Sequence, residues 1–246
     1  MQELMGKVAL VTGGSRGIGA AIAKALSEKG ADVAITYVNS KERASAVTAA
    51  IEASGRRGLA IRADAADVAA ARAAVDETVR VLGRLDILVN NAGIFAASPP
   101  EKVTIEEIDT MLAIHVKSVF VASQAALDHM GEGGRIISIG SCLAHHVPGP
   151  GLTLYSMTKA ALGGFARGLA RDVGKRGITV NNIDPGPTDT DMNPADSDRA
   201  DASRKLIALG HYGKAEDIAA TVTHLAGSGG RFITGTSIAV DGGMNA

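Results

Sequence analysis

Short runs of aliphatic and β-branched residues alternate with longer alanine-rich segments along the chain. The short runs are continuously apolar, which predicts strands buried on both faces, and the apolar positions of the longer segments recur with a helical period. Alternation of this kind is typical of βαβ units and predicts a parallel sheet with helices on both faces. Strands are expected at residues 8–12, 32–37, 58–63, 87–90, 135–139, 179–183 and 237–240, and helices at residues 17–29, 41–53, 68–82, 105–130, 156–175 and 215–226.

The spacing of these elements predicts one domain over residues 1–246. Of these residues 46% are hydrophobic and 21% are charged, which is typical of a soluble globular protein. No linker rich in proline or serine interrupts the alternation. Residues 186–203 follow a strand and are rich in Pro, Asp, Ser and Thr. We expect a substrate lid around residues 186–210, with a solvated connector as the alternative.

Charge and cysteine content narrow the partners. The formal net charge of −1 supplies no overall attraction to nucleic acid or to an anionic membrane, so neither is expected as a partner. Residues 136–158 lack charge but contain two prolines, several glycines and the pair His145-His146, unlike a membrane span. Cys142 is the only cysteine, and no basic-then-apolar leader opens the chain. These features predict a cytoplasmic protein.

A glycine-rich segment, residues 12–19, joins the first predicted strand to the first predicted helix. Glycines let the backbone approach a phosphate, and the helix N-terminus directs free N–H groups and a positive dipole end toward it. This context predicts a dinucleotide site, although a purely structural turn is the alternative. The residues expected to contact the cofactor here are Gly13, Ser15, Arg16, Gly17, Ile18 and Gly19.

The end of the second predicted strand favours NADP(H), with NAD(H) as the alternative. An acidic residue at this point usually binds the adenosine ribose, but here the strand ends in Tyr37. An acid would repel a 2′-phosphate, whereas Arg16 and Lys41 could neutralise one, with Asn39 and Ser40 donating hydrogen bonds. Solvated surface cations are the competing interpretation of the two basic residues.

Tyr155 and Lys159 lie four residues apart at the start of a predicted helix and can share one face. Bringing the pKa of a tyrosine from about 10 to near 7 requires about 4 kcal/mol. A cation about 4 Å away supplies about that much at an effective dielectric constant of 20. Lys159 is therefore adequate in magnitude to activate Tyr155, although an ordinary helix pair has the same spacing.

Taken together, the glycine segment and several later motifs resemble the short-chain dehydrogenase/reductase family, and specifically its 3-oxoacyl-carrier-protein reductases. The resemblance extends over nearly the whole chain. It implies a Rossmann-like, doubly wound α/β fold with a seven-stranded parallel sheet, reversible hydride transfer and a homotetramer. The motifs that carry it, beyond residues 12–19, are Asn90-Asn91-Ala92-Gly93, Ser141, Tyr155 with Lys159, and Pro185-Gly186.

The resemblance also implies residue roles. Tyr155 would be the general acid in carbonyl reduction and the general base in alcohol oxidation, and Ser141 would bond the substrate oxygen. Lys159 would lower the pKa of Tyr155 and contact the nicotinamide ribose, and Asn90 would stabilise neighbouring strands. Further cofactor contacts are expected from Asp64, Ala65, Asn91, Ala92, Gly93, Pro185, Gly186, Thr188 and Thr190.

Two departures from the family pattern leave alternatives open. His115 stands where members usually carry a catalytic Asn, so it is either a proton-relay residue or a buried structural histidine. Ser141 and Tyr155 are 14 residues apart, one more than is common, and the intervening loop is expected to line the substrate pocket. Metal ligation by His145-His146 is disfavoured because companion ligands are missing, and Cys142 is expected to pack rather than react.

These features predict an enzyme that acts on a ketone, aldehyde or secondary alcohol. A 3-oxoacyl carrier substrate stays open, because only Lys175 and Arg176 offer basic charge for an acidic carrier protein. The alternative function is a nucleotide-binding regulator with little or no turnover. A purely structural role would leave the ordered motifs unexplained.

Overall fold

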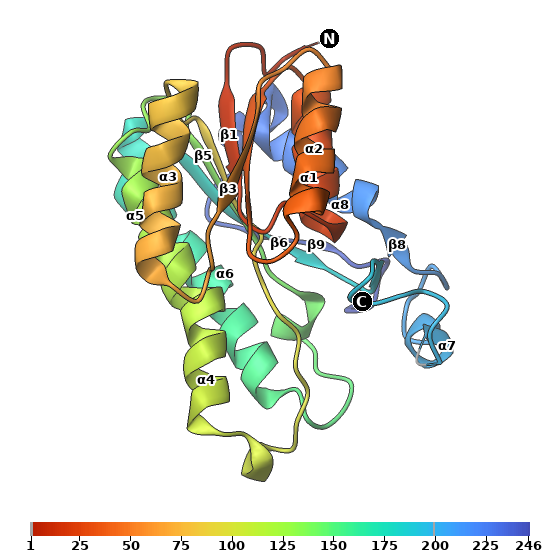
Figure 1. The fold of residues 1–246 in the computed structure, drawn as a ribbon. Coiled ribbons are helices and arrows are strands. Elements are labelled where there is room, and N and C mark those ends of the chain that lie inside the picture. Colours follow the sequence, from red (N-terminus) through yellow and green to blue (C-terminus); the bar gives the residue numbers. More distant parts are fainter. Residues whose placement is uncertain (1, 199) are drawn as a thin grey trace.

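The computed structural model describes residues 2–198 and 200–246. At its centre is the expected parallel sheet of seven strands (Figure 1). The strand order, which was not predicted, is β3-β2-β1-β4-β5-β6-β9. The strands are β1 (Val8–Val11), β2 (Asp32–Tyr37), β3 (Gly58–Arg62), β4 (Ile87–Asn90), β5 (Arg135–Ile139), β6 (Thr179–Pro185) and β9 (Ser237–Val240).

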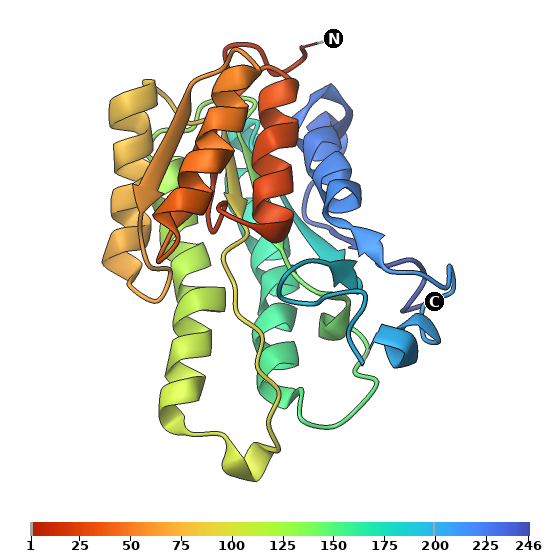
Figure 2. The ribbon, with the colours of Figure 1, turned by 45° about the vertical axis from the view of Figure 1, so that its right-hand side comes forward.

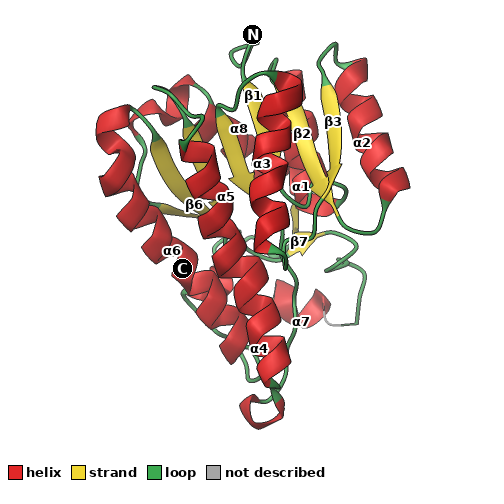
Figure 3. Cartoon of the chain, turned by 60° about the vertical axis from the view of Figure 1, so that its left-hand side comes forward, coloured by secondary structure: helices red, strands yellow, loops and turns green. Residues whose placement is uncertain are grey.

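Helices cover both faces of this sheet (Figures 1 and 2). One apolar cluster packs α1 (Gly17–Glu28), α2 (Lys41–Ala53) and α8 (Ala215–Ala226) onto the first face. A second cluster packs α3 (Val68–Leu82), α5 (Ser118–Leu127) and α6 (Thr153–Val173) onto the other face (Figure 3). The layers confirm the predicted doubly wound, Rossmann-like architecture.

Local signals in the sequence explain where several helices begin and end. The Asp67 carboxylate accepts hydrogen bonds from the N–H groups of Ala69 and Ala70 and so caps α3. Gly83 ends the same helix in a left-handed conformation with φ +92°. Thr104 and Glu107 form a reciprocal capping box at the start of α4 (Ile105–Leu112).

The long helix predicted at residues 105–130 is interrupted. Between α4 and α5 lies a π-helical turn, Ala113–Lys117, which contains the buried His115. The apolar spacing continues through this turn, so periodicity did not reveal it. Turns of this kind inside helices are frequent at functional sites.

Several short elements escaped prediction. They are α7 (Ala200–Arg204), the paired two-residue strands β7 (Thr188–Asp189) and β8 (Gly213–Lys214), and the 3-10 turns Pro100–Lys102, Cys142–Ala144, Gly174–Arg176 and Ser228–Phe232. Ala200 and Ile207 in the predicted lid form a small separate apolar cluster with Tyr212, which follows it. Residue 199, which falls in that lid, lies outside the described residues. The role of residues 186–210 as a substrate lid stays a prediction.

The run from Ile105 to Leu127 is long and apolar enough to cross a membrane by length and composition, with a mean hydropathy of 1.3. Half of its most apolar window is buried inside the protein. Here α5 packs against α3 and α4 packs against α6, as expected of a core helix.

The order of the strands predicts where in this fold a ligand binds. The connections run in opposite directions from β1, toward β2 on one side and β4 on the other. Ligands bind at the carboxyl ends of strands at such a switch point. The glycine segment follows β1, and the segment that begins with Asn91 follows β4, so both reach the same edge of the sheet.

Candidate active site

A continuous cleft of about 1160 Å³ runs along this edge. Except for Lys41, its wall includes the residues predicted to contact the cofactor, together with Ser141, Tyr155 and Lys159. The volume exceeds the roughly 300–1,000 Å³ of a typical small-molecule site, so the cleft has room for a ligand larger than one small molecule. Segments far apart in sequence thus meet where the motifs predicted.

The glycine segment is shaped for a phosphate. A Cβ atom on Gly19 would lie 2.4 Å from Nδ2 of Asn91 and 2.5 Å from the carbonyl oxygen of Gly13, so only glycine fits there. Gly17 adopts φ +52°, where side chains are strained. The first turn of α1, which the structure describes in full, carries no acidic residue and no side-chain cap. Its N–H groups and its dipole therefore favour an anion.

Two hydrogen-bonding side chains hold this segment against β4. The Thr12 hydroxyl accepts from the N–H groups of Asn91 and Ala92, both at 3.0 Å. The Asn91 amide donates to the carbonyls of Thr12 and Gly13. Asn90 ties β4 to α5 through a 3.1 Å bond to the Ser123 hydroxyl. These bonds fix the edge on which a dinucleotide would lie.

The far end of the cleft carries two guanidinium groups. Arg16 and Arg43 both pair with the Asp191 carboxylate, at 2.9 and 2.7 Å. All three side chains are substantially exposed, and the two arginines lower the pKa of Asp191. Arg43 was missed by the sequence reasoning, which named Lys41 instead. Only Arg43 of these two lies in the cleft wall.

Tyr155 and Lys159 converge at the inner end, as their spacing predicts. Nζ of Lys159 lies 5.9 Å from the centroid of the Tyr155 ring and donates a 2.8 Å bond to the carbonyl of Ile139. Lys159 is 5% exposed, and burial lowers its pKa to about 8. The ammonium is thus held inside the protein beside the phenol.

The pKa of Tyr155 corrects the sequence prediction. Lys159 was expected to lower it, but burial raises it to about 12, and a side-chain hydrogen bond with Ser141 only partly opposes this. The negative charge of Asp184 raises it further. The largest cause is desolvation, because burial disfavours the charged phenolate. The phenol is therefore protonated at neutral pH in the protein alone.

His115 is wholly enclosed and bonded through both ring nitrogens. Nε2 accepts from the N–H of Ile94 at 3.1 Å, so Nδ1 carries the proton and donates to the Thr158 hydroxyl at 2.9 Å. Burial and the nearby Lys159 lower its pKa to about 3, so the ring is neutral at pH 7. His115 is 1% exposed and is absent from the cleft wall. This geometry favours a positioning role, and a proton relay stays a prediction.

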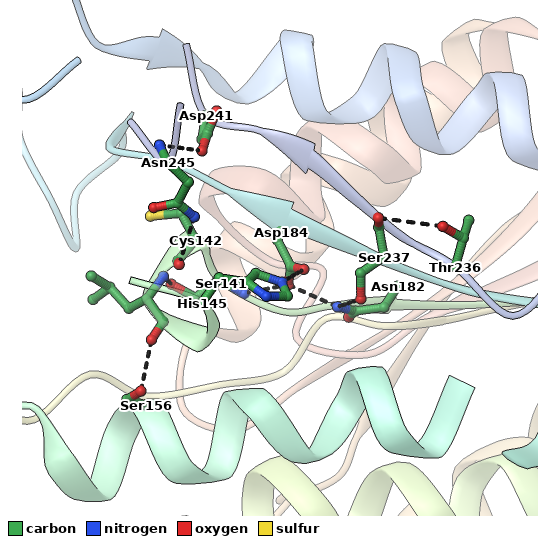
Figure 4. Close-up of polar contacts among 11 residues, drawn as sticks. Ser141, Cys142, His145, Ser156, Asn182, Asp184, Thr236, Ser237, Asp241 and Asn245 are labelled. Atoms are coloured by element: carbon green, nitrogen blue, oxygen red, sulfur yellow. Dashed lines mark hydrogen bonds and ion pairs between the residues drawn. The ribbon is translucent and has the colours of Figure 1, made fainter. Parts of the chain in front are cut away.

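The turn after Ser141 is organised by a residue that the sequence reasoning missed. The Asp184 carboxylate accepts from the Ser141 N–H at 3.0 Å and from Nε2 of His145 at 2.8 Å (Figure 4). The available signal was an acid at the end of a strand predicted to be buried, where a carboxylate is rare without a partner. Burial raises the pKa of the Cys142 thiol to about 11, consistent with the expected packing role.

No group of three or more His, Cys, Asp or Glu residues that could hold a metal occurs in residues 2–198 and 200–246. His145 is instead bound to Asp184, as described above. Lys175 and Arg176 were the basic residues considered for contact with an acidic carrier protein. The Arg176 guanidinium donates to the carbonyls of Leu127 and Met130 at the end of α5, so it serves the fold.

Comparisons with known proteins agree with this geometry. A family model described as enoyl-(acyl carrier protein) reductase matches residues 13–245. The chain is 42% identical to the cyclic-di-GMP-binding biofilm dispersal mediator protein of Escherichia coli K12, over the full length of both. It is 41% identical to the 3-oxoacyl-[acyl-carrier-protein] reductase FabG of Staphylococcus aureus, over 98% of both chains.

A solved structure is closer still. The short-chain dehydrogenase from Burkholderia cenocepacia J2315, in complex with NADP, superposes with a TM-score of 0.98 at 60% identity, over 99% of this chain and 100% of that one. Fold, motif order and sequence identity over the full length lead to one conclusion: the chain belongs to the short-chain dehydrogenase/reductase family of oxidoreductases.

Proposed function

We propose that this protein is an NADP(H)-dependent carbonyl reductase that uses Ser141, Tyr155 and Lys159. One observation carries the proposal: these three side chains meet at the inner end of a cleft whose other end carries two guanidinium groups. The reaction adds hydride to a carbonyl carbon and a proton to its oxygen, giving an alcohol. NADPH supplies the hydride when bound, and the oxidised nicotinamide brings a positive charge to the same site.

The cofactor preference rests on the exposed end of the cleft. Tyr37 ends β2 without a carboxylate, and Arg16 and Arg43 stand where a 2′-phosphate would need cations. Asn39 and Ser40 in the same wall supply neutral hydrogen-bonding groups. The NADP complex of the Burkholderia relative supports the same choice. NADH would lack the charge that these arginines are placed to bind.

The protonation state of Tyr155 favours reduction over oxidation. Because its pKa lies at about 12, the phenol holds its proton at neutral pH and can give it to the oxygen of the carbonyl being reduced. The Ser141 side chain forms a hydrogen bond with Tyr155. Lys159 stays charged below about pH 8 and stabilises the phenolate that proton donation leaves behind.

The substrate side of the cleft is apolar. The Phe95 ring contacts Tyr155 edge-on, with a centroid separation of 5.0 Å. Apolar side chains continue the wall beyond Tyr155, among them Pro148, Leu152, Met192, Leu206 and Met244. We therefore favour an uncharged, apolar ketone or aldehyde, or the matching secondary alcohol, over a carrier-bound 3-oxoacyl chain. Arg176 is occupied at α5, which leaves Lys175 as a weak site for an acidic carrier.

Substrate profiling with both cofactors tests this function. The panel comprises apolar ketones and aldehydes of increasing size, a 3-oxoacyl thioester on acyl carrier protein and the same thioester on a small pantetheine. We expect NADPH consumption with the apolar carbonyls and the pantetheine thioester, no gain from the carrier and a strong preference over NADH. NADPH binding without consumption on any substrate would contradict the proposal.

A second candidate function is a nucleotide-binding regulator with little turnover. The full-length similarity to the cyclic-di-GMP-binding protein of Escherichia coli favours keeping it. A regulator of this kind would bind cyclic-di-GMP with an affinity that NADPH reduces, because both anions need the same cations. Calorimetric titration of the protein with cyclic-di-GMP, with and without NADPH, distinguishes the two. Tight binding together with absent carbonyl turnover supports the regulator.

We also propose a cytoplasmic homotetramer. Phe120 on α5 is 57% exposed and stacks edge-on with Phe165 on α6, with centroids 5.9 Å apart, so an aromatic surface extends across both helices. Phe232, beside the edge strand β9, is 98% exposed. Exposed apolar surface of this kind marks interfaces. Analytical ultracentrifugation of the wild type and Phe120→Asp should show a tetramer and a smaller species, and a monomeric wild type would contradict it.

A further inference from the structure

Asp184 is a carboxylate with no exposed surface at the end of β6, directly before Pro185. A buried charge is tolerated only when hydrogen bonds replace its lost water. Oδ1 accepts from the Ser141 N–H at 3.0 Å and from the Asn182 amide at 2.7 Å, and Oδ2 accepts from Nε2 of His145 at 2.8 Å. Figure 4 shows the carboxylate between the His145 ring and the Asn182 amide.

Two of the residues that Asp184 binds, Ser141 and His145, lie at the two ends of the turn Cys142–Ala144. Ser141 precedes this turn and His145 follows it, so one carboxylate holds both of its ends. The Ser156 hydroxyl donates to the carbonyl of Leu143 at 2.7 Å and joins the turn to α6, one residue after Tyr155. The Asn245 amide bonds the carbonyl of Cys142 at 2.9 Å from the C-terminal side (Figure 4).

We propose that Asp184 and His145 are positioning residues of the reaction, which hold the Ser141 turn so that the Ser141 hydroxyl and the Tyr155 phenol reach the same carbonyl oxygen. The proposal rests on the proposed reductase function. Neither residue needs to touch the substrate, and His145 is absent from the cleft wall. A displacement of about 1 Å at a reacting group can lower a rate about 100-fold, so an anchor for this turn has leverage on catalysis.

The charge of Asp184 adds a second effect that a neutral anchor would lack. It raises the pKa of Lys159, against the lowering caused by burial, and it also raises the pKa of Tyr155. The other ionisable groups around Tyr155 are Lys159 on its own helix, Cys142 in the turn and the neutral His115 beneath it. Removing the charge should therefore lower the pKa of the ammonium and that of the phenol.

Three variants separate geometry from charge. His145→Ala removes the second anchor, and His145→Gln restores an N–H donor near the position of Nε2. Asp184→Asn keeps an oxygen for the Ser141 N–H but removes the charge. His129→Ala is the matched control, because His129 and Asp76 form a His–Asp pair on the surface at 3.3 Å.

The measurements are kcat and KM from about pH 6 to 9.5, the dissociation constant of NADPH, and amide hydrogen exchange of residues 141–145. We expect His145→Ala to lower kcat about tenfold with unchanged NADPH affinity and to speed exchange in the turn about tenfold. His145→Gln should restore most of the lost kcat and most of the lost protection from exchange. Asp184→Asn should move the alkaline fall in kcat to lower pH, and His129→Ala should match the wild type.

Wild-type kcat, pH profile and turn exchange in both His145→Ala and Asp184→Asn would overturn the positioning role. So would losses of kcat and NADPH affinity in equal proportion, which would indicate general disruption. Hydrogen exchange keeps the two proposals separate. If the wild type shows no Tyr155-dependent turnover, the reductase function fails, while unchanged exchange in His145→Ala independently rejects the anchor.

Discussion

The two ends of the cleft hold their charges in opposite environments. At the inner end, Lys159 is 5% exposed and Asp184 is fully enclosed, and burial shifts the pKa values of Lys159 and Tyr155. At the outer end, the side chains of Arg16, Arg43 and Asp191 are 41–57% exposed and pair in water. The interaction energy between two charges is far larger in a desolvated site than at a hydrated surface. We therefore expect the inner end to control the rate and the outer end to select between cofactors.

Tyr155→Phe should have the largest effect, at the buried end. The phenyl ring keeps the packing against Phe95 and His115 but has no proton to give. General acid catalysis contributes about 10²- to 10⁴-fold, so kcat should fall by that factor. Steady-state kinetics should show this loss with NADPH affinity nearly unchanged. Retention of more than about a third of the wild-type kcat would place the proton donor elsewhere.

A pH profile sharpens the same comparison. Burial lowers the pKa of Lys159 to about 8, so its ammonium is present below that pH and lost above it. The phenol stays protonated up to about pH 12 and does not set this limb. We expect kcat for reduction to be flat from about pH 6 to 8 and then to fall about tenfold per pH unit.

Lys159→Arg provides the matched control for the profile. Because a guanidinium keeps its charge throughout the alkaline range of the profile, the activity that remains should not show the alkaline fall. An unchanged limb in this variant would assign the ionisation to another group.

At the exposed end, Arg16→Ala and Arg43→Ala should act on the cofactor alone. Hydrogen bonds to a charged group are worth about 1.5–3 kcal/mol, so each change should raise KM for NADPH about tenfold or more. KM for NADH and kcat should change less than about twofold. Lys41→Ala, an exposed neighbour outside the cleft wall, is the control. Equal losses with both cofactors would remove the argument for a 2′-phosphate site.

Asp191→Asn should have the smallest effect and the opposite sign. The carboxylate occupies both guanidinium groups and competes with a cofactor phosphate for them. Exposed ion pairs are weak, so KM for NADPH should fall only about threefold, with no change for NADH. Weaker NADPH binding in this variant would mean that Asp191 orders the arginines instead.

Most of the fold could be predicted because the determining patterns are local. The predicted ranges for β2, β4, β5, β9, α2, α3 and α8 match the structure, since their apolar runs and helical periods end at clear signals. The π turn at Ala113–Lys117 could not be predicted, because its apolar spacing continues that of α4. The pair β7 and β8 depends on contacts between segments 25 residues apart.

In the candidate site, too, local patterns could be predicted from the sequence and long-range contacts could not. Tyr155 and Lys159 are helix neighbours, so their convergence was readable from spacing. The bonds of Asp184 to Ser141 and of Arg43 to Asp191 join residues 43 and 148 positions apart, which local patterns cannot reveal. The direction of the Tyr155 pKa also required the structure, because spacing gives the nearby cation but not the extent of burial.

Hydride transfer from deuterium-labelled NADPH tests the central claim most directly. Wild-type protein, labelled NADPH and an apolar ketone are incubated, and the alcohol is analysed by mass spectrometry. The account predicts one deuterium on the carbinol carbon per NADPH consumed, and almost none with Tyr155→Phe at equal cofactor occupancy. Bound NADPH that yields no labelled alcohol with wild-type protein, or equal labelling by Tyr155→Phe, would contradict it.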